Sequence, residues 1–241
     1  MKVSLHTPEK DSHKGENGKL LIVGGSKTFH GAPMLAILAA RRFVDLVFLL
    51  PGQKDSHLIN AVKTIPEAIV VYDMKGLMDM DCVLFGTGLA EAKFDMKKLK
   101  GPRLVVDADG LKRIKGKIPA GTILTPHEGE FRMLFGKPGT EMNVKIAAAK
   151  NRCFILKKGP ADIISDGRKV VKNRVHNPGM TKGGTGDVLA GLVAALACKN
   201  PPMKAMQAAA AIAGRAGNRL KKTHGYSYCA SDLAEELAFA V

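Results

Sequence analysis

The sequence predicts a single α/β domain in three layers (α/β/α), with a mainly parallel central sheet between two layers of helices. Short β-rich runs alternate with helical stretches along almost all of the 241 residues, which is typical of a parallel sheet covered by helices. Each candidate strand is a nearly continuous apolar run, as expected for a strand buried on both faces. Aromatic residues are scarce, with no Trp and 3 Tyr, so aliphatic side chains and Ala carry most of the apolar content.

The elements follow in order from these patterns. The apolar runs that predict strands are KLLIVGG (19–25), LVFLL (46–50), AIVVY (68–72), CVLFG (82–86), RLVVDAD (103–109), TILT (122–125) and CFILKK (153–158). The candidate helices are residues 32–43, 128–136, 141–150, 187–198, 203–220 and 231–240. Residues 162–174 are expected to form a β-hairpin that turns at Asp166-Gly167. No linker or repeat divides the chain, so residues 1–241 are expected to form one domain.

The formal net charge of +15 limits the partners to be considered. Such a charge attracts nucleic acid, an acidic membrane surface or a polyanionic small molecule, although a solvated basic surface explains it equally well. The lysines are dispersed, and no aromatic RNA-binding motif or zinc-finger spacing accompanies them. We therefore expect no nucleic-acid partner.

The cysteines and the apolar runs predict the compartment. Cys82, Cys153, Cys198 and Cys229 are far apart, without a CxxC pair, and resemble small buried hydrophobes in a reducing compartment. No apolar run approaches the ~18 residues of a membrane span, and the N-terminal residues lack the apolar core of a signal peptide. These features predict a cytoplasmic protein without a membrane partner.

Polar, Gly-rich segments follow the predicted strands. They are GGSKTFHGAP (24–33), GTGLA (86–90), DADG (107–110), TPHEGE (125–130), KKGPAD (157–162) and, later, NPGMTKGGTGD (177–187). In open α/β sheets, ligands bind at the carboxyl ends of the strands. The segments therefore predict one wide cleft for an extended polar ligand.

The segment GGTGD, residues 183–187, has two interpretations. A helix is expected from Asp187, and the first N–H groups of a helix attract anions, so the glycines could cradle a phosphate beside a working carboxylate. Alternatively, Asp187 is only the N-cap that follows a Gly-rich turn. These residues alone do not decide between the two.

Taken in order, the segments resemble the NAD(P)H-hydrate dehydratase family. The resemblance rests on HKGENGKLLIVGGS with GAP, then GTG, VVDADGL, ILTPHEGE, LKKGPADII and NPGMTKGGTGDVLAGLVAAL, and it covers nearly the whole chain. It implies a ribokinase-like fold and, since the chain starts almost directly at HKG, a dehydratase without the fused epimerase domain of some relatives. It also implies that ADP or ATP drives the dehydration of the (S)-hydrates of NADH and NADPH (NADHX and NADPHX), releasing phosphate and AMP or ADP. Mg²⁺ and a homo-oligomer, such as a tetramer, are implied as well.

The resemblance assigns a nucleotide site in two segments. Asp187 is expected to be the catalytic base that takes a proton from the substrate hydroxyl, and to contact the substrate. The expected nucleotide-binding residues are Lys158, Gly159, Pro160, Ala161, Asp162, Asn177, Pro178, Gly179, Met180, Thr181, Lys182, Gly183, Gly184, Thr185 and Gly186. Two of them depart from the family, in which a hydroxyl residue is more usual at Asp162 and an uncharged residue at Lys182. For Lys182, added charge at the phosphate site and exposure to solvent both remain open, with solvent slightly favoured.

The resemblance also assigns the substrate side. Ala32, Gly88 and His127 are expected to bind the hydrated cofactor, although a polar histidine at the end of a loop is the simpler interpretation of His127. Glu130, three residues after His127, could cap the N-terminus of a helix together with Thr125 or His127, which is a structural role. Acidic residues such as Asp107 and Asp109 could position Mg²⁺ through water, but the spacing reveals no direct ligand set.

Two other functions remain open at this stage. The first is a ribokinase-like kinase for a vitamin precursor, since the fold and the phosphate loop are shared and fold does not determine function. The pair TPHEGE and NPGMTKGGTGD argues against it. The second is a non-catalytic nucleotide-binding protein, which would not need the Asp187 carboxylate beside anionic phosphates.

Overall fold

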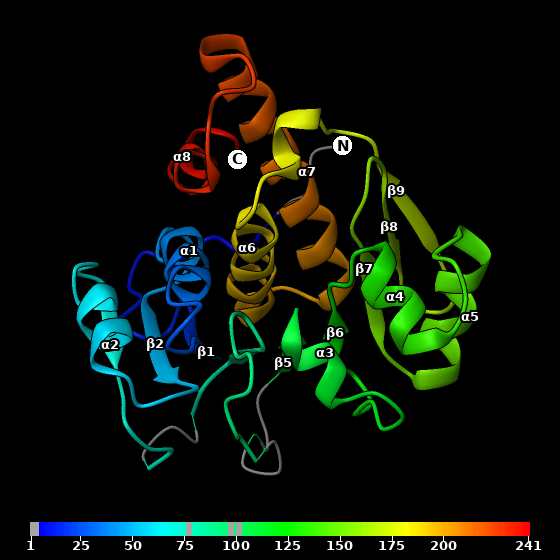
Figure 1. The fold of residues 1–241 in the computed structure, drawn as a ribbon. Coiled ribbons are helices and arrows are strands. Elements are labelled where there is room, and N and C mark those ends of the chain that lie inside the picture. Colours follow the sequence, from blue (N-terminus) through cyan, green and yellow to red (C-terminus); the bar gives the residue numbers. More distant parts are fainter. Residues whose placement is uncertain (1–4, 76–78, 96–98, 100–102) are drawn as a thin grey trace.

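A nine-stranded sheet forms the centre of the protein. The computed structural model describes residues 5–75, 79–95, 99 and 103–241, and its strands lie in the order β3-β2-β1-β4-β5-β6-β7-β8-β9 (Figure 1). β1 to β7 run parallel to one another, whereas β8 pairs antiparallel with both β7 and β9. The bounds are β1 Lys19–Gly24, β2 Leu46–Pro51, β3 Ala68–Val70, β4 Cys82–Phe85, β5 Arg103–Val106, β6 Ile123–Leu124, β7 Phe154–Lys157, β8 Asp162–Ser165 and β9 Val170–Asn173.

Helices cover both faces of the sheet, so the predicted three-layer α/β/α class is confirmed. The helices are α1 Gly31–Ala40, α2 Ser56–Val62, α3 Asp109–Arg113, α4 Glu128–Phe135, α5 Glu141–Asn151, α6 Thr185–Lys199, α7 Pro202–His224 and α8 Ala230–Glu236, with 3₁₀ turns at Pro178–Thr181 and Leu237–Phe239. Among the described residues, no helix is both long and apolar enough to cross a bilayer.

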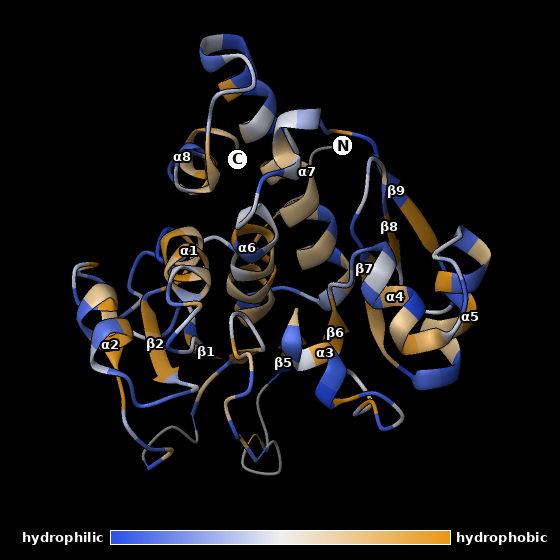
Figure 2. Ribbon diagram, in the orientation of Figure 1, coloured by the Kyte–Doolittle hydropathy of each residue, from blue (hydrophilic) through white to orange (hydrophobic). Residues whose placement is uncertain are grey.

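Alternation along the strands builds two hydrophobic cores. In β1, Leu20 and Ile22 face a core shared with α1, α2, α6, α7 and α8, whereas Leu21 and Val23 face a core shared with α3, α4 and α5. Successive side chains of a strand point to opposite faces of the sheet, and both faces of this sheet are covered. This burial explains the continuous apolar runs in the sequence, and β2, for example, is mostly orange, the colour of hydrophobic residues, in Figure 2.

Every predicted strand and helix overlaps an observed one, and most differences are at the ends. The predicted strand 103–109 ends at Val106, because Ala108 has a φ of 49° and α3 begins at Asp109. The predicted helix 231–240 is α8 followed by a 3₁₀ turn. The hairpin is confirmed as β8 and β9, with Gly167 at a φ of 86° in its turn.

Helix α6 positions the predicted phosphate loop. Every residue from Val188 to Cys198 is buried, because the helix lies between the sheet and the helices α1 and α7. Gly191 permits the approach of α1, since a Cβ at that position would overlap the carbonyl oxygen of Ala36. The first turn of α6 is thus held in place by a fully packed helix.

Candidate functional site

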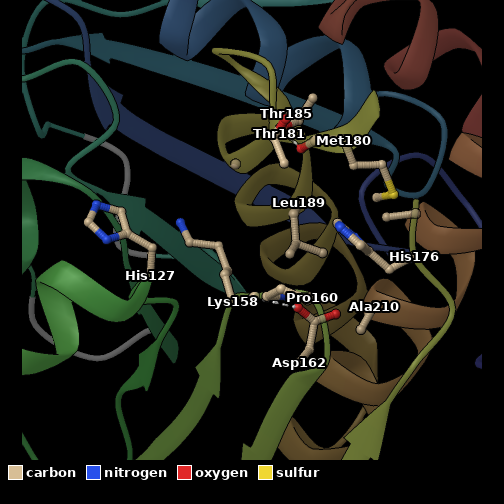
Figure 3. Close-up of a pocket in the computed structure, with 13 residues that line it drawn as sticks. His127, Lys158, Pro160, Asp162, His176, Met180, Thr181, Thr185, Leu189 and Ala210 are labelled. Carbon is tan, nitrogen blue, oxygen red and sulfur yellow. Dashed lines mark hydrogen bonds between the residues drawn. The ribbon is translucent and has the colours of Figure 1, made fainter. Parts of the chain in front are cut away.

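A cavity of about 330 Å³ lies where the predicted nucleotide segments meet. Figure 3 shows side chains from the end of β7, from the loop before α6 and from the helices α6 and α7 around it. Nine lining residues were predicted from the sequence: His127, Lys158, Gly159, Pro160, Asp162, Met180, Thr181, Thr185 and Gly186. Four were not: His176, Leu189, Ala210 and Ala213.

The four lining residues that the sequence did not predict were missed for different reasons. Leu189 and Ala210 lie on core helices, where the sequence gives no reason to separate a pocket-lining residue from a buried one. His176 directly precedes the NPGM segment, so its position next to a predicted binding loop was the available signal. It faces the same side of the cavity as Asp162 and Ala210 (Figure 3).

A buried ion pair lies beside the cavity. Lys158, just after β7, places Nζ 2.7 Å from Oδ1 of Asp107, which follows β5. Thr125 donates its hydroxyl to the same oxygen over 2.8 Å. Burial alone would lower the pKa of Lys158, but the negative charges of Asp107, Glu130 and Asp187 outweigh it, so its pKa lies above the usual value. Lys158 therefore stays positively charged at neutral pH.

Lys158 and the start of α6 converge on one point. A Cβ added at Gly186 would lie 3.4 Å from Nζ of Lys158, so the ammonium group lies alongside the first turn of the helix. The leading N–H groups of a helix lack partners within it and carry partial positive charge. A lysine and a helix N-terminus together favour the binding of a phosphate.

Asp187 is not the N-cap of α6, which was one of the two interpretations that the sequence left open. α6 begins at Thr185, two residues earlier, after Gly184 with a φ of 91°. Glycine adopts this left-handed conformation without penalty, so the chain turns into the helix before Asp187. The hydroxyl of Thr185 donates to the carbonyl oxygens of Met180 (2.7 Å) and Lys182 (2.8 Å), which closes the loop on itself. The carboxylate of Asp187 is therefore not required as a cap.

The environment of Asp187 raises its pKa to about 7. Burial is the largest cause, and the carboxylates of Asp107 and Glu130 add to it, while the ammonium group of Lys158 opposes it. A carboxylate with this pKa is about half ionised at neutral pH and can accept a proton readily. A raised pKa was not required by the sequence argument, and the structure adds it to the account.

The NPGM segment is held by its own side chains. Asn177 is buried, and its Oδ1 accepts hydrogen bonds from the N–H of Gly179 (2.9 Å) and the hydroxyl of Tyr228 (2.7 Å). Its Nδ2 donates to Asn218 over 3.0 Å. Asn177 is thus a structural residue of the loop before α6, and it does not line the cavity. Six other predicted nucleotide residues also lie outside the cavity lining: Ala161, Pro178, Gly179, Lys182, Gly183 and Gly184.

The two departures from the family pattern both have partners. Asp162 accepts the N–H of Gly159 (3.2 Å) with one oxygen and Nδ2 of Asn173 (3.0 Å) with the other, so it shapes the loop after β7. Burial raises the pKa of Asp162, and these hydrogen bonds oppose the rise. Lys182 is exposed to solvent, as the sequence slightly favoured, but its ammonium group also has partners in the protein. Its Nζ donates to the carbonyl oxygens of Tyr226 and Tyr228, both over 2.6 Å.

Ala32 and Gly88 lie together, outside this cavity. A Cβ at Gly88 would lie 2.6 Å from the carbonyl oxygen of Phe29 and 3.0 Å from Cβ of Ala32, so the GTG turn is packed directly on the GAP segment. Gly25 donates its N–H to the carbonyl oxygen of Thr87 over 2.8 Å. Gly86 leaves no space for a Cβ against the backbone of Asp107. Three post-strand loops are therefore in contact, as the topology of the sheet predicted.

His127 caps α4. Its Nδ1 accepts the N–H groups of Gly129 (3.0 Å) and Glu130 (3.2 Å), while the Glu130 carboxylate accepts the N–H of His127 over 2.8 Å. This reciprocal pair is a capping box, the alternative that the sequence left open for Glu130. Because His127 also lines the cavity, the cap holds its ring at the edge of the site.

The side chains of the described residues do not form a metal site by themselves, but some of them could bind a metal ion together with the phosphates of a nucleotide. No group of three or more His, Cys, Asp or Glu side chains among them could enclose a metal ion. Asp109 faces away, since it accepts the N–H of Ala90 (2.9 Å) and pairs with Lys112 (2.8 Å). Asp107 and Asp187 are two carboxylates whose charges act on Lys158, beside the first turn of α6. Mg²⁺ commonly binds through one or two carboxylates, waters and substrate phosphates, which such a pair satisfies.

Comparison with known proteins agrees with the geometry. Residues 20–238 match the family model described as NAD(P)H-hydrate dehydratase. The chain is 37% identical over 257 residues to the ADP-dependent (S)-NAD(P)H-hydrate dehydratase of Cenarchaeum symbiosum, which covers 95% of this chain and 90% of the relative. It is 36% identical to the bifunctional NAD(P)H-hydrate repair enzyme Nnr of Methanocaldococcus jannaschii, covering 97% of this chain and 50% of the relative. The chain thus spans about half the length of such bifunctional relatives.

Solved structures show the same fold. The ADP/ATP-dependent NAD(P)H-hydrate dehydratase of Bacillus subtilis, co-crystallised with ATP/Mg²⁺, superposes with a TM-score of 0.86 at 26% identity, over 97% of this chain and 92% of that one. A hydroxyethylthiazole kinase of Pyrococcus horikoshii shares only the fold, with a TM-score of 0.63 at 17% identity, over 94% of this chain and 89% of that one.

Proposed function

The chain belongs to the NAD(P)H-hydrate dehydratase family, and we propose that it uses ADP or ATP to dehydrate the (S)-hydrates of NADH and NADPH. The products are the intact reduced cofactor, phosphate and AMP from ADP or ADP from ATP. The observation that carries the proposal is that Lys158 lies beside the first turn of α6, the turn that also carries Asp187, and that its charge acts on the pKa of Asp187. A cation, a helix N-terminus and a proton acceptor are the groups that phosphoryl transfer to a hydroxyl requires.

The nucleotide is expected to bind in the cavity beside α6. Its phosphates would contact the ammonium group of Lys158 and the N–H groups from Gly183 to Gly186, where helix dipole and lysine both favour anions. The apolar wall formed by Leu189, Ala210 and Ala213 is suited to the base. The hydrated cofactor would lie beside the contact between Ala32 and Gly88, with His127 at the edge of the site.

Asp187 is expected to start the reaction as a general base. It takes the proton of the substrate hydroxyl while the hydroxyl oxygen attacks the terminal phosphorus of the nucleotide, and the bond from that phosphorus to the bridging oxygen breaks. The hydroxyl thereby becomes a phosphate ester, a far better leaving group. Its C–O bond then breaks with the electron pair on phosphate, assisted by the ring nitrogen. Loss of a proton from the adjacent carbon restores the ring double bond.

Mg²⁺ is proposed to accompany the nucleotide. Bound to the phosphates, it would supply positive charge against the charge that develops during transfer. Asp107 is the carboxylate that would help to hold it, since Asp187 is assigned as the base. Since Oδ1 of Asp107 already accepts from Lys158 and Thr125, we expect the phosphates and waters to provide most of the ligands.

Recovery of the reduced cofactor tests the proposal. Purified NADHX or NADPHX is incubated with the protein, Mg²⁺ and either ADP or ATP, and the near-ultraviolet absorbance of the reduced nicotinamide ring is followed. We expect the absorbance to rise only when a nucleotide is present. A vitamin-precursor kinase would instead phosphorylate its alcohol substrate and leave the hydrate unchanged, so no rise with either nucleotide contradicts the proposal.

A cytoplasmic homo-oligomer, such as a tetramer, is proposed from the family resemblance alone. The Ala-rich part of α7 does not explain the assembly, since Ala205, Ala208, Ala209, Ala213 and Ala216 are buried within this chain. Light scattering of the purified protein measures the oligomeric state directly.

A further inference from the structure

The turn between α7 and α8 supports the phosphate loop. We use "α7–α8 turn" for residues 225–229 and "phosphate loop" for residues 179–186. The Nζ of Lys182 donates to the carbonyl oxygens of Tyr226 and Tyr228 over 2.6 Å each, and lies 5.8 Å from the centre of the Tyr228 ring. One ammonium group thereby joins two segments that are more than forty residues apart in the sequence.

Tyr228 makes a second connection between the same segments. The residue is fully buried, and its hydroxyl donates to Oδ1 of Asn177 over 2.7 Å. Gly179 lies against its ring, so closely that an added Cβ would be 2.7 Å from ring atoms. A Cβ at Gly184, at the other end of the loop, would lie 3.0 Å from Cβ of Ala230, just beyond the turn. The phosphate loop is therefore packed on this turn at Gly179, whereas at Gly184 it contacts the first residue of α8 and, more closely, Leu35 of α1.

A positive charge is chemically suited to this position. α7 ends at His224, and Gly225 follows with a φ of 59°, so the carbonyl groups of the next residues are turned away from a continuing helix. Carbonyl oxygens outside a helix can accept hydrogen bonds from the ammonium group of a lysine, which has three donors. Hydrogen bonds from an ammonium group are stronger than those between neutral groups. Lys182 is therefore held by acceptors of the protein itself.

The same contacts separate Lys182 from Lys158. Lys158 lines the cavity and lies beside Gly186, where a phosphate is expected, whereas Lys182 does not line the cavity and its ammonium group faces the turn. The ammonium group of Lys158 thus pairs with Asp107, whereas that of Lys182 is bonded to the α7–α8 turn. A direct phosphate contact by Lys182 would require it to leave both carbonyl oxygens.

We propose that Lys182 is a positioning residue, whose ammonium group fixes the phosphate loop on the α7–α8 turn and so arranges the N–H groups for nucleotide. The inference rests on the proposed function only in assigning nucleotide to this loop. A loop that is ordered before binding spares the nucleotide the entropic cost of ordering it. Loss of the contact should therefore weaken nucleotide binding more than it slows the chemical step.

Amide hydrogen exchange of the nucleotide-free protein provides the first test. In Lys182→Met, which keeps the length of the side chain without its donors, we expect exchange of residues 179–186 and 225–229 to accelerate by about tenfold, the effect of one lost charged hydrogen bond. Lys221→Met is the matched control, because Lys221 lies 5.2 Å from the Tyr226 ring and is not bonded to the loop. Unchanged exchange in Lys182→Met overturns the proposal, whether or not the protein is a dehydratase.

Affinity for ADP, measured by calorimetry, provides the second test. We expect the Kd to rise about tenfold in Lys182→Met, with kcat changed less than about threefold, and Lys182→Arg to restore most of the affinity. Tyr228→Phe removes the hydroxyl donor to Asn177 but no charge, and it should also raise the Kd for ADP. The proposal is wrong if Lys182→Met lowers the affinity for ADP, Tyr228→Phe does not, and the difference between Lys182→Met and the wild type disappears at high salt. That result would show that Lys182 binds phosphate directly.

The two experiments distinguish a failure of the proposed function from a failure of the positioning role of Lys182. If the wild-type protein does not bind ADP, the exchange experiment still decides whether Lys182 orders the loop. If the wild type binds ADP and Lys182→Met binds it equally well, the nucleotide assignment survives and the positioning role is rejected.

Discussion

Asp187 and Lys158 have opposite charges but depend on the same surroundings. Burial and two nearby carboxylates raise the pKa of Asp187 to about 7, and the Lys158 ammonium group limits that rise. The carboxylates in turn keep Lys158 protonated despite its burial. The site therefore holds a fixed positive charge beside a carboxylate that can accept a proton at neutral pH.

Replacement of the carboxylate separates binding from chemistry. In Asp187→Asn we expect kcat for hydrate recovery to fall by about a thousandfold, within the range lost when a general base is removed. The Kd for ADP should stay within about threefold of the wild type, because the amide keeps the shape of the site and removes a negative charge near the phosphates. Calorimetry and single-turnover kinetics measure both quantities. Turnover that persists at the wild-type rate would show that another group is the base.

The pH profile reports on the same carboxylate. The base must be ionised, so kcat/KM should fall as the pH drops below about 7, by about tenfold per unit once Asp187 is mostly protonated. Lys158→Met removes the positive charge that lowers the pKa of Asp187, so the midpoint of the profile should move to higher pH. A midpoint that moves to lower pH, or does not move, would contradict the electrostatic account of the site.

At the scale of elements, the position of the loop depends on α6. The sequence correctly predicted this helix from its apolar spacing, but placed its start at Asp187 instead of Thr185. The difference arises at Gly184, whose left-handed conformation is a property of the folded loop. Terminal residues of helices are the least predictable part of an element, because tertiary contacts decide them.

Gly191 tests how firmly α6 is held. Gly to Ala inside a helix normally stabilises a protein by up to about 1 kcal/mol. Here the added methyl group would overlap the backbone of Ala36 on α1, so we expect Gly191→Ala to lower the free energy of unfolding by about 1–3 kcal/mol. Gly31→Ala, at the first residue of α1 with nothing within 4 Å of the added Cβ, is the control and should be neutral or stabilising. Urea denaturation compares them, and equal stability of the two variants would contradict the close packing of α1 and α6.

The parallel strands were predictable because burial on both faces writes a continuous apolar run into the sequence. Two short helices, α2 and α3, were missed, since they have seven and five residues and too few turns for a periodic pattern. Asp55, which caps α2 by accepting the N–H of Leu58 over 3.0 Å, was a usable signal.

At the scale of the whole molecule, the sheet edge gathers residues that are distant in sequence. The post-strand segments could be predicted to meet there, because parallel strands place their carboxyl ends together. The partners of Lys182 and the contribution of His176 could not, since each depends on which loops touch across the folded site. The sequence thus predicted which segments meet at the cavity, whereas the different partners of Lys158 and Lys182 became visible only in the structure.

The coupling between nucleotide and hydrate tests the central claim most directly. Phosphate release and recovery of the reduced nicotinamide are measured together, with NADHX or NADPHX as the substrate and ADP or ATP in excess. The account predicts one phosphate for each cofactor restored, and neither product when the hydrate or the nucleotide is omitted. Phosphate released without recovery of the cofactor, or a phosphorylated product that accumulates in its place, would contradict it.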